Sequence, residues 1–135
     1  RIQMLFTGTK ASGVQQTKSK FGDILTLDEA VSRLFSTLTP EEKDFIMKNN
    51  PEANFFGGMN LRNELKLWVR ETPLVQFFIK TYGLCHADDI SGMIMKSLWA
   101  KVRRGHFNAN IEAVKYKTHW RSLGYDPATM EKLSK

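Results

Sequence analysis

The chain of 135 residues is 41% hydrophobic and carries 20 lysine and arginine residues against 14 acidic ones, a formal net charge of +6. This length fits one domain, and the apolar content supplies a core that needs no disulfide or metal staple. The single cysteine, Cys85, excludes an internal disulfide and favours a reducing, intracellular location. No apolar run approaches the roughly 18–20 residues of a membrane span, so we expect a cytoplasmic protein without membrane contact.

Charge is segregated along the chain. Residues 1–22 hold four cations and no acid, residues 23–95 hold 7 cations and 11 acids, and residues 96–121 hold 7 cations and one acid. The first of these segments is rich in Gly, Ser, Thr and Gln, which is typical of chain that buries little surface. We therefore expect a basic extended arm over residues 1–22 and a single domain over residues 23–135. The arm residues expected to contact a partner are Phe6, Lys10, Lys18 and Lys20.

Helix signals begin after the arm. Thr26 and Glu29 have the spacing of a capping box, in which the two side chains satisfy backbone groups at the start of a helix. Thr39 and Glu42 repeat that spacing around a proline suited to the first helical position, which predicts a second helix. This helix should end before Pro51, because the residue that precedes proline avoids the helical conformation.

A glycine pair, Gly57-Gly58, interrupts the helical pattern, and a third helix is predicted to follow it. Its expected apolar stripe consists of Leu61, Leu65, Trp68 and Val69. Thr72-Pro73 begins a fourth helix, Leu74–Tyr82, and Gly83 is the residue type that ends helices. Because this fourth helix is apolar on nearly all sides, we expect it to lie at the centre of the domain.

Two basic helices are expected next. The fifth spans about Asp88–Arg104, with a buried face made of Ile90, Met93, Ile94, Leu98 and Val102. Asn108 can cap a sixth helix, Ala109–Leu123, that ends at Gly124. A proline then opens a short seventh helix, about Pro127–Leu133. The sequence therefore predicts an all-α domain of about six to seven short helices.

The basic segment is the main candidate for a binding site. Lys96, Trp99 and Arg103 share one face of the fifth helix, and an aromatic ring between two cations can stack on bases while the cations neutralise phosphates. The sixth helix adds two pairs of basic residues spaced four apart. The expected site for an acidic partner consists of Lys96, Trp99, Arg103, Arg104, Lys115, Lys117, His119 and Arg121. Three other interpretations of this face are open. Trp99 is part of the core, the cations compensate the negative end of the helix dipole, or the charged face is simply solvated.

His86, Asp88 and Asp89 form the tightest polar cluster of the sequence. Such a trio can bind a divalent metal or supply a general acid and base. Two aspartates at a helix start also complement its dipole, with the histidine as a turn residue, and we prefer this structural interpretation. No catalytic residue, metal ligand or cofactor is therefore predicted. The sequence also lacks a zinc-ligand pattern, a phosphate-binding loop and a nucleophile motif.

Two stretches carry a resemblance to known sequences: GGMNLRNELKLW, residues 57–68, and YGLCHADDISGMIMKSLW, residues 82–99. They resemble an uncharacterised family of small helical proteins of bacteria and their phages. The matching positions are Arg62, Asn63, Trp68, Gly83, His86, Asp88, Asp89, Ser91 and Trp99. The chain departs from the pattern at Ala87, where the family has proline, and at Glu64-Leu65, where another aromatic residue is common. Over about the central third of the chain, the resemblance implies an all-α fold and a bacterial or phage source, but no activity.

We interpret the matched residues as a structural signature. The expected polar network ties the third helix to the start of the fifth through Arg62, Asn63, His86, Asp88 and Asp89. If Arg62 pairs with a buried carboxylate, Arg62→Ala should be strongly destabilising, because the carboxylate would be left without a partner.

These patterns favour a non-enzymatic binding module. We expect a phage or bacterial accessory or inhibitor protein that docks an acidic partner, either nucleic acid or a protein that handles nucleic acid. One alternative is an assembly subunit of a virion or larger complex, or a homo-oligomer, in which the arm grips a neighbour. The other is a metal-dependent enzyme that uses His86, Asp88 and Asp89. The sequence does not choose among DNA, RNA and protein as the acidic partner.

Overall fold

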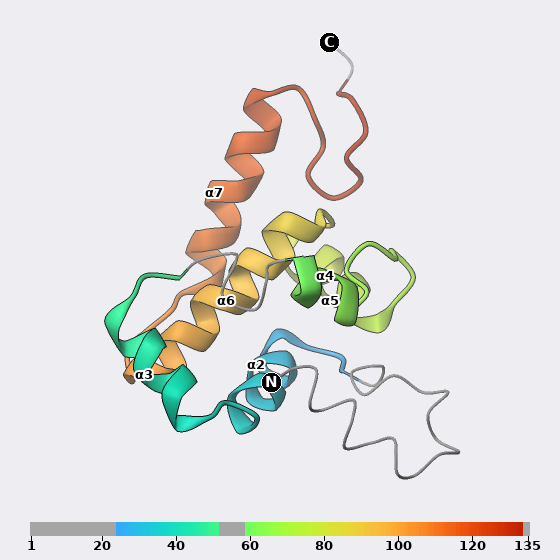
Figure 1. The fold of residues 1–135 in the computed structure, drawn as a ribbon. Helices are drawn as coiled ribbons and strands as arrows, with labels where there is room; N and C mark the ends of the chain where they lie inside the picture. The colour runs from blue at the N-terminus through green and yellow to red at the C-terminus, as the bar shows by residue number, and fades with distance from the viewer. Residues whose placement is uncertain (1–23, 52–58, 134–135) are drawn as a thin grey trace, which may run out of the picture.

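The computed structural model describes residues 24–51 and 59–133, so the arm expected over residues 1–22 lies outside the described residues. The described residues form six α-helices, in agreement with the predicted all-α class (Figure 1). They are α2 (Leu27–Ser36), α3 (Pro40–Lys48), α4 (Met59–Glu64), α5 (Pro73–Tyr82), α6 (Ala87–Arg103) and α7 (Ala109–Ser122). None of the helices in this part of the chain is long and apolar enough to cross a membrane.

The central element is α6. It packs against α2, α3, α4 and α7, whereas α5 packs mainly against α2 (Figure 1). The prediction that the fourth helix of the chain, α5, is central was therefore wrong. Although α5 is apolar on most sides, Phe77 and Ile79 remain only partly buried at the edge of the core. Helix α6 is the longer helix and buries residues on several sides, among them Ile90, Ile94 and Trp99.

Three of the predicted helix ends depend on local chemistry, and the structure confirms them. Thr39 Oγ1 accepts the backbone N–H of Glu42, and the Glu42 carboxylate accepts the N–H of Thr39, which completes the capping box of α3. Asn108 caps α7 by accepting the N–H of Ile111 over 3.0 Å. Gly83 ends α5 at a φ of 69°, a left-handed conformation that glycine adopts without steric cost.

The third predicted helix is shorter than expected. Helix α4 ends at Glu64, and Lys66 follows with a φ of 55°. This left-handed residue lets the N–H of Leu67 donate to the carbonyl of Arg62 over 2.9 Å and turns the Leu67 side chain into the core. Trp68 is consequently 57% exposed, and the expected apolar stripe through Trp68 and Val69 does not form.

The predicted seventh helix is also wrong, because residues 125–133 form a compact turn. The Asp126 carboxylate accepts the N–H of Ala128 over 2.9 Å, and Tyr125 forms an isolated antiparallel bridge with Lys132. Arg70 donates to the carbonyls of Ala128 and Thr129 over 3.2 and 3.0 Å. These side chains satisfy backbone groups that a helix would have paired with one another, so the turn competes successfully with the helix.

This C-terminal turn covers one side of Cys85. The backbone N–H of Cys85 donates to the carbonyl of Pro127 over 3.1 Å, and a guanidinium nitrogen of Arg70 lies 3.6 Å from the Cys85 sulfur. Burial raises the pKa of the Cys85 thiol, although the adjacent Arg70 charge acts in the opposite direction. The thiol is therefore a partly covered, protonated group at the junction of α5, α6 and the turn.

Candidate functional site

Trp99 does not present its ring to solvent as the predicted basic face requires. The residue is 2% exposed, and its indole N–H donates to the carbonyl of Asn49 over 2.8 Å. Arg103 donates to the carbonyl of Ile46 over 3.0 Å and also to that of Asn49. The last carbonyls of a helix lack partners within the helix and attract donors, which explains why this face of α6 turns towards the end of α3. The proposed stacking platform on α6 is therefore excluded.

Lys96 is engaged within the fold as well. Its ammonium group pairs with the carboxylate of Glu112, a buried residue of α7, and lies 5.5 Å from the centre of the Tyr116 ring. Burial acts to lower the pKa of Lys96, but the hydrogen bond that Lys96 donates to Glu112 and the negative charge of Glu112 outweigh burial and raise this pKa. Burial likewise acts to raise the pKa of Glu112, and Lys96 outweighs it and lowers that pKa. The pair fastens the beginning of α7 to the middle of α6.

The remaining predicted cations lie on α7 and in the turn that precedes it. Arg104, Lys115, His119 and Arg121 are exposed. Lys115 also lies 3.7 Å from an oxygen of Glu112. The stem of Lys117 is partly buried beside Gly83, at the end of α5, where a Cβ added to the glycine would lie 3.4 Å from the lysine Cδ. The structure thus divides the predicted site: Lys96, Trp99 and Arg103 of α6 make contacts within the fold, and most of the α7 residues face outward.

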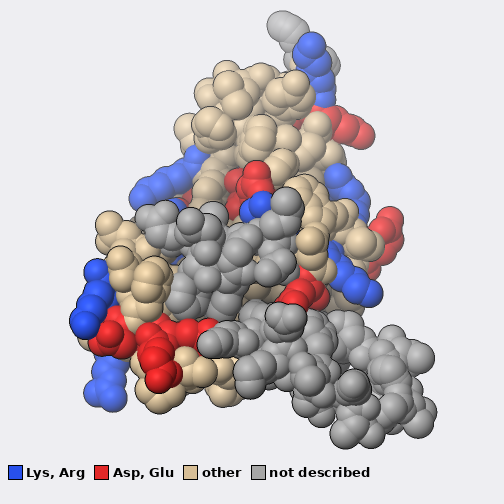
Figure 2. All heavy atoms as spheres, in the orientation of Figure 1, with Lys and Arg blue, Asp and Glu red and all other residues tan. Residues whose placement is uncertain are grey.

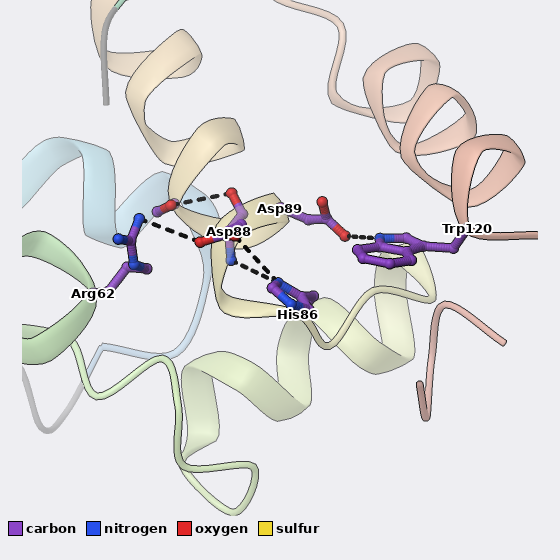
Figure 3. A network of polar contacts seen from close by, with 6 residues as sticks. Arg62, His86, Asp88, Asp89 and Trp120 are labelled. Carbon is purple, nitrogen blue, oxygen red and sulfur yellow. Dashed lines mark hydrogen bonds and ion pairs between the residues drawn. The ribbon is translucent and has the colours of Figure 1, made fainter. Parts of the chain in front are cut away.

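The polar cluster at the start of α6 is engaged in contacts within the fold (Figure 3). His86 caps the helix, since its Nδ1 accepts the N–H of Asp88 over 3.0 Å. An Arg62 guanidinium nitrogen lies 3.3 Å from the Asp88 carboxylate. Asn63 is exposed, and its backbone carbonyl accepts the N–H of Lys66. Of the expected network, the structure therefore joins Arg62 to Asp88 and does not show Asn63 reaching either aspartate.

Asp89 reaches across to α7 through a partner that the sequence patterns missed. Its carboxylate is buried and accepts the indole N–H of Trp120 over 2.7 Å, and the Trp120 ring stacks on His86 at a centroid distance of 5.2 Å (Figure 3). Burial raises the pKa of Asp89. The Trp120 hydrogen bond and the nearby His86 act to lower this pKa, but burial outweighs them. The spacing of Ala113, Tyr116 and Trp120 along one side of α7 is the signal that could have indicated this inner face.

These contacts make the expected effect of removing Arg62 much smaller. Asp88, its partner, is 62% exposed, so the ion pair is largely screened by solvent. We expect Arg62→Ala to lower the free energy of unfolding by about 1 kcal/mol or less, including the contact of the guanidinium with the Trp68 ring. Urea unfolding of this variant and of Arg62→Met, which keeps the apolar stem, measures the effect. A loss of several kcal/mol would show that Asp88 behaves as a buried charge.

Metal-ligating side chains do not gather at this cluster. Within residues 24–51 and 59–133, no group of three or more His, Cys, Asp or Glu residues is placed to hold a metal ion. His86, Asp88 and Asp89 each have a partner in the protein that accounts for their position. Their arrangement supports a structural role at the beginning of α6 and the attachment of α7.

The described residues define a helical core, α2–α6, with an additional helix attached to one side of it. The chain belongs to a family described as a domain of unknown function, DUF6794, whose model matches residues 25–102, more than half of the chain. This match confirms that an uncharacterised family covers the central part of the chain. It spans α2 to α5 and nearly all of α6, and it leaves α7 outside. No curated protein and no solved structure matches the chain.

Proposed function

We propose that this protein is a non-enzymatic binding module that docks an acidic partner through the outer face of α7. We define this outer face by Ile111, Val114, Lys115, Thr118 and Arg121, all of which are exposed. The observation that carries the proposal is the distribution of charge on the helix. Its single acid, Glu112, is buried against Lys96, so the charged side chains on the solvent side of α7 are all cations. A cationic surface of this kind attracts acidic partners over several ångströms.

Charge elsewhere on the molecule supports this assignment. Arg104 extends the cationic region into the turn before α7. Acidic side chains gather instead low on the left of the face drawn in Figure 2, where Figure 1 places α2 and α3. Those helices carry Asp28, Glu29, Glu41, Glu42 and Asp44. Lys48 pairs with Asp44 among these acids, whereas the charged side chains on the outer face of α7 are all cations.

The remaining functions suggested by the sequence receive less support. Assembly through the N-terminal arm concerns residues outside the described part of the chain. Enzyme chemistry at His86, Asp88 and Asp89 would have to displace the helix cap, the Arg62 pair and the Trp120 hydrogen bond. A bacterial or phage accessory or inhibitor protein agrees with the resemblance of residues 57–68 and 82–99, and we include this origin in the proposal.

A pull-down with the full chain as bait tests the proposal. The prey is compared for the wild type, the double variant Lys115→Gln/Arg121→Gln, and the control Lys66→Gln/Lys80→Gln, which removes the same charge from exposed lysines elsewhere. We expect prey that binds the wild type and the control, is lost from the α7 variant, and weakens as salt is raised. Prey that the α7 variant retains in full would contradict the proposal. Parallel samples treated with nuclease distinguish nucleic acid from protein.

A further inference from the structure

The outer face of α7 has an apolar centre between its cations. Ile111 and Val114 are 57% and 55% exposed and lie three residues apart, on the side of the helix opposite the buried Ala113. Lys115 and Arg121 lie on the two flanks of this pair. Two aliphatic side chains one turn apart on an exposed helix are a small apolar surface with a charged border, which is the arrangement of many protein-binding surfaces.

The side chains that attach α7 to α6 lie away from its outer face, where Lys115 also contacts Glu112. The helix buries only Ala113 and Glu112, and side-chain contacts fasten it near both ends, through Lys96–Glu112 and Asp89–Trp120. Figure 1 shows that the C-terminal half of α7 extends beyond the other helices. A helix of 14 residues is marginal by itself in water, so its stability depends on its attachment to the rest of the protein.

The chemistry of this face favours protein over nucleic acid. A surface that binds nucleic acid takes most of its affinity from cations and hydrogen-bond donors on phosphates, and from aromatic rings on unpaired bases. Trp99, the aromatic residue that the sequence placed in the basic face, is buried, and aliphatic groups occupy the centre of the α7 face. Aliphatic groups are instead the natural contact of an amphipathic helix, which presents apolar anchors on one side.

We infer that the partner of α7 is an acidic amphipathic protein segment that packs its apolar residues on Ile111 and Val114 and its carboxylates on Lys115 and Arg121. This inference rests on the proposed function and makes the partner specific. Both components are needed: the carboxylates favour encounter with the cationic helix, and burial of the aliphatic pair slows dissociation.

Selection from a library of random displayed peptides tests the inference on the full chain. We expect the enriched peptides to be acidic, with apolar residues three or four positions apart. Their affinity should fall about tenfold or more for Ile111→Ser/Val114→Ser and also for Lys115→Gln/Arg121→Gln. The matched control is Leu25→Ser/Met47→Ser, which changes two similarly exposed apolar residues elsewhere in the chain and should bind as the wild type does. Circular dichroism of each variant verifies that it is folded.

A random-sequence DNA duplex serves as the competing probe in the same assay. Peptides that lack acidic residues, or that bind the Ile111→Ser/Val114→Ser variant unchanged, would overturn the inference. If the duplex binds more tightly than any peptide, and only the charge variant weakens it, the partner is nucleic acid; the inference then fails and the proposed function stands. If neither probe responds to loss of Lys115 and Arg121, both the inference and the proposed function fail.

Discussion

Replacing Trp99 by alanine is expected to lower the free energy of unfolding by about 3–5 kcal/mol, the largest loss we expect from a single substitution in this protein. The ring is almost wholly enclosed in the core, so truncation leaves a large cavity. It also removes the hydrogen bond to the carbonyl of Asn49, which fixes the end of α3 on α6. Urea unfolding followed by circular dichroism measures the loss.

The other tryptophan of the resemblance provides the matched control. Trp68 is more than half exposed, and its contacts are the Arg62 guanidinium and the edge of His86. Trp68→Ala should therefore cost about 1 kcal/mol or less. Trp99→Phe keeps most of the ring volume and loses the N–H, so its cost should fall between the two. Equal losses for the two alanine variants would contradict the burial of Trp99 described above.

Trp120→Phe is expected to cost about 2 kcal/mol at neutral pH. Phenylalanine retains an aromatic ring against His86 but has no N–H for Asp89, whose buried carboxylate would then lack its donor. An ionised group left in this position carries a desolvation penalty without compensation. The loss should shrink in acid, because a protonated Asp89 tolerates burial better. Urea unfolding of the variant at acidic and neutral pH measures both effects, and a loss independent of pH would contradict this explanation.

Asp89→Asn isolates the contribution of the carboxylate to the pH dependence. Because burial raises the pKa of Asp89 in the folded state, the folded protein holds this proton more tightly than the unfolded chain does. The stabilisation from Asp89 is therefore fully present in acid and is lost as the pH rises through the folded-state pKa. The asparagine variant should lack this part of the decline. Wild-type and variant stabilities that run parallel across the pH series would refute the assignment.

The elements that were predicted correctly depend on neighbouring residues. The capping box at Thr39, the Asn108 cap and the glycine after α5 act within a few positions of the chain, so their sequence pattern is sufficient. The two wrong elements depend on distant partners. The C-terminal turn depends on Arg70, which donates hydrogen bonds to its carbonyls. The early end of α4 depends on Lys66, whose left-handed backbone places the Leu67 side chain in the core.

The candidate site shows the same limit. Helical spacing placed Lys96, Trp99 and Arg103 on one face of α6 but did not indicate which way the face points. That direction is set by carbonyls at the end of α3, some fifty residues away along the chain. The link between Asp89 and Trp120 spans 31 residues and joins the family-matched core to a helix outside it. Helical spacing can mark the inner face of α7, but it does not identify the partner of Trp99 or of Trp120.

The position of Cys85 beneath the C-terminal turn makes this thiol a natural probe of local opening of the turn. As the single cysteine of the chain, it gives one unambiguous site for an alkylating reagent. Its sulfur lies beside Arg70, and its backbone is held by Pro127 in the C-terminal turn. The thiol is protonated and partly covered, so we expect its alkylation to quicken when residues 125–133 detach, and the alkylation rate then reports that opening.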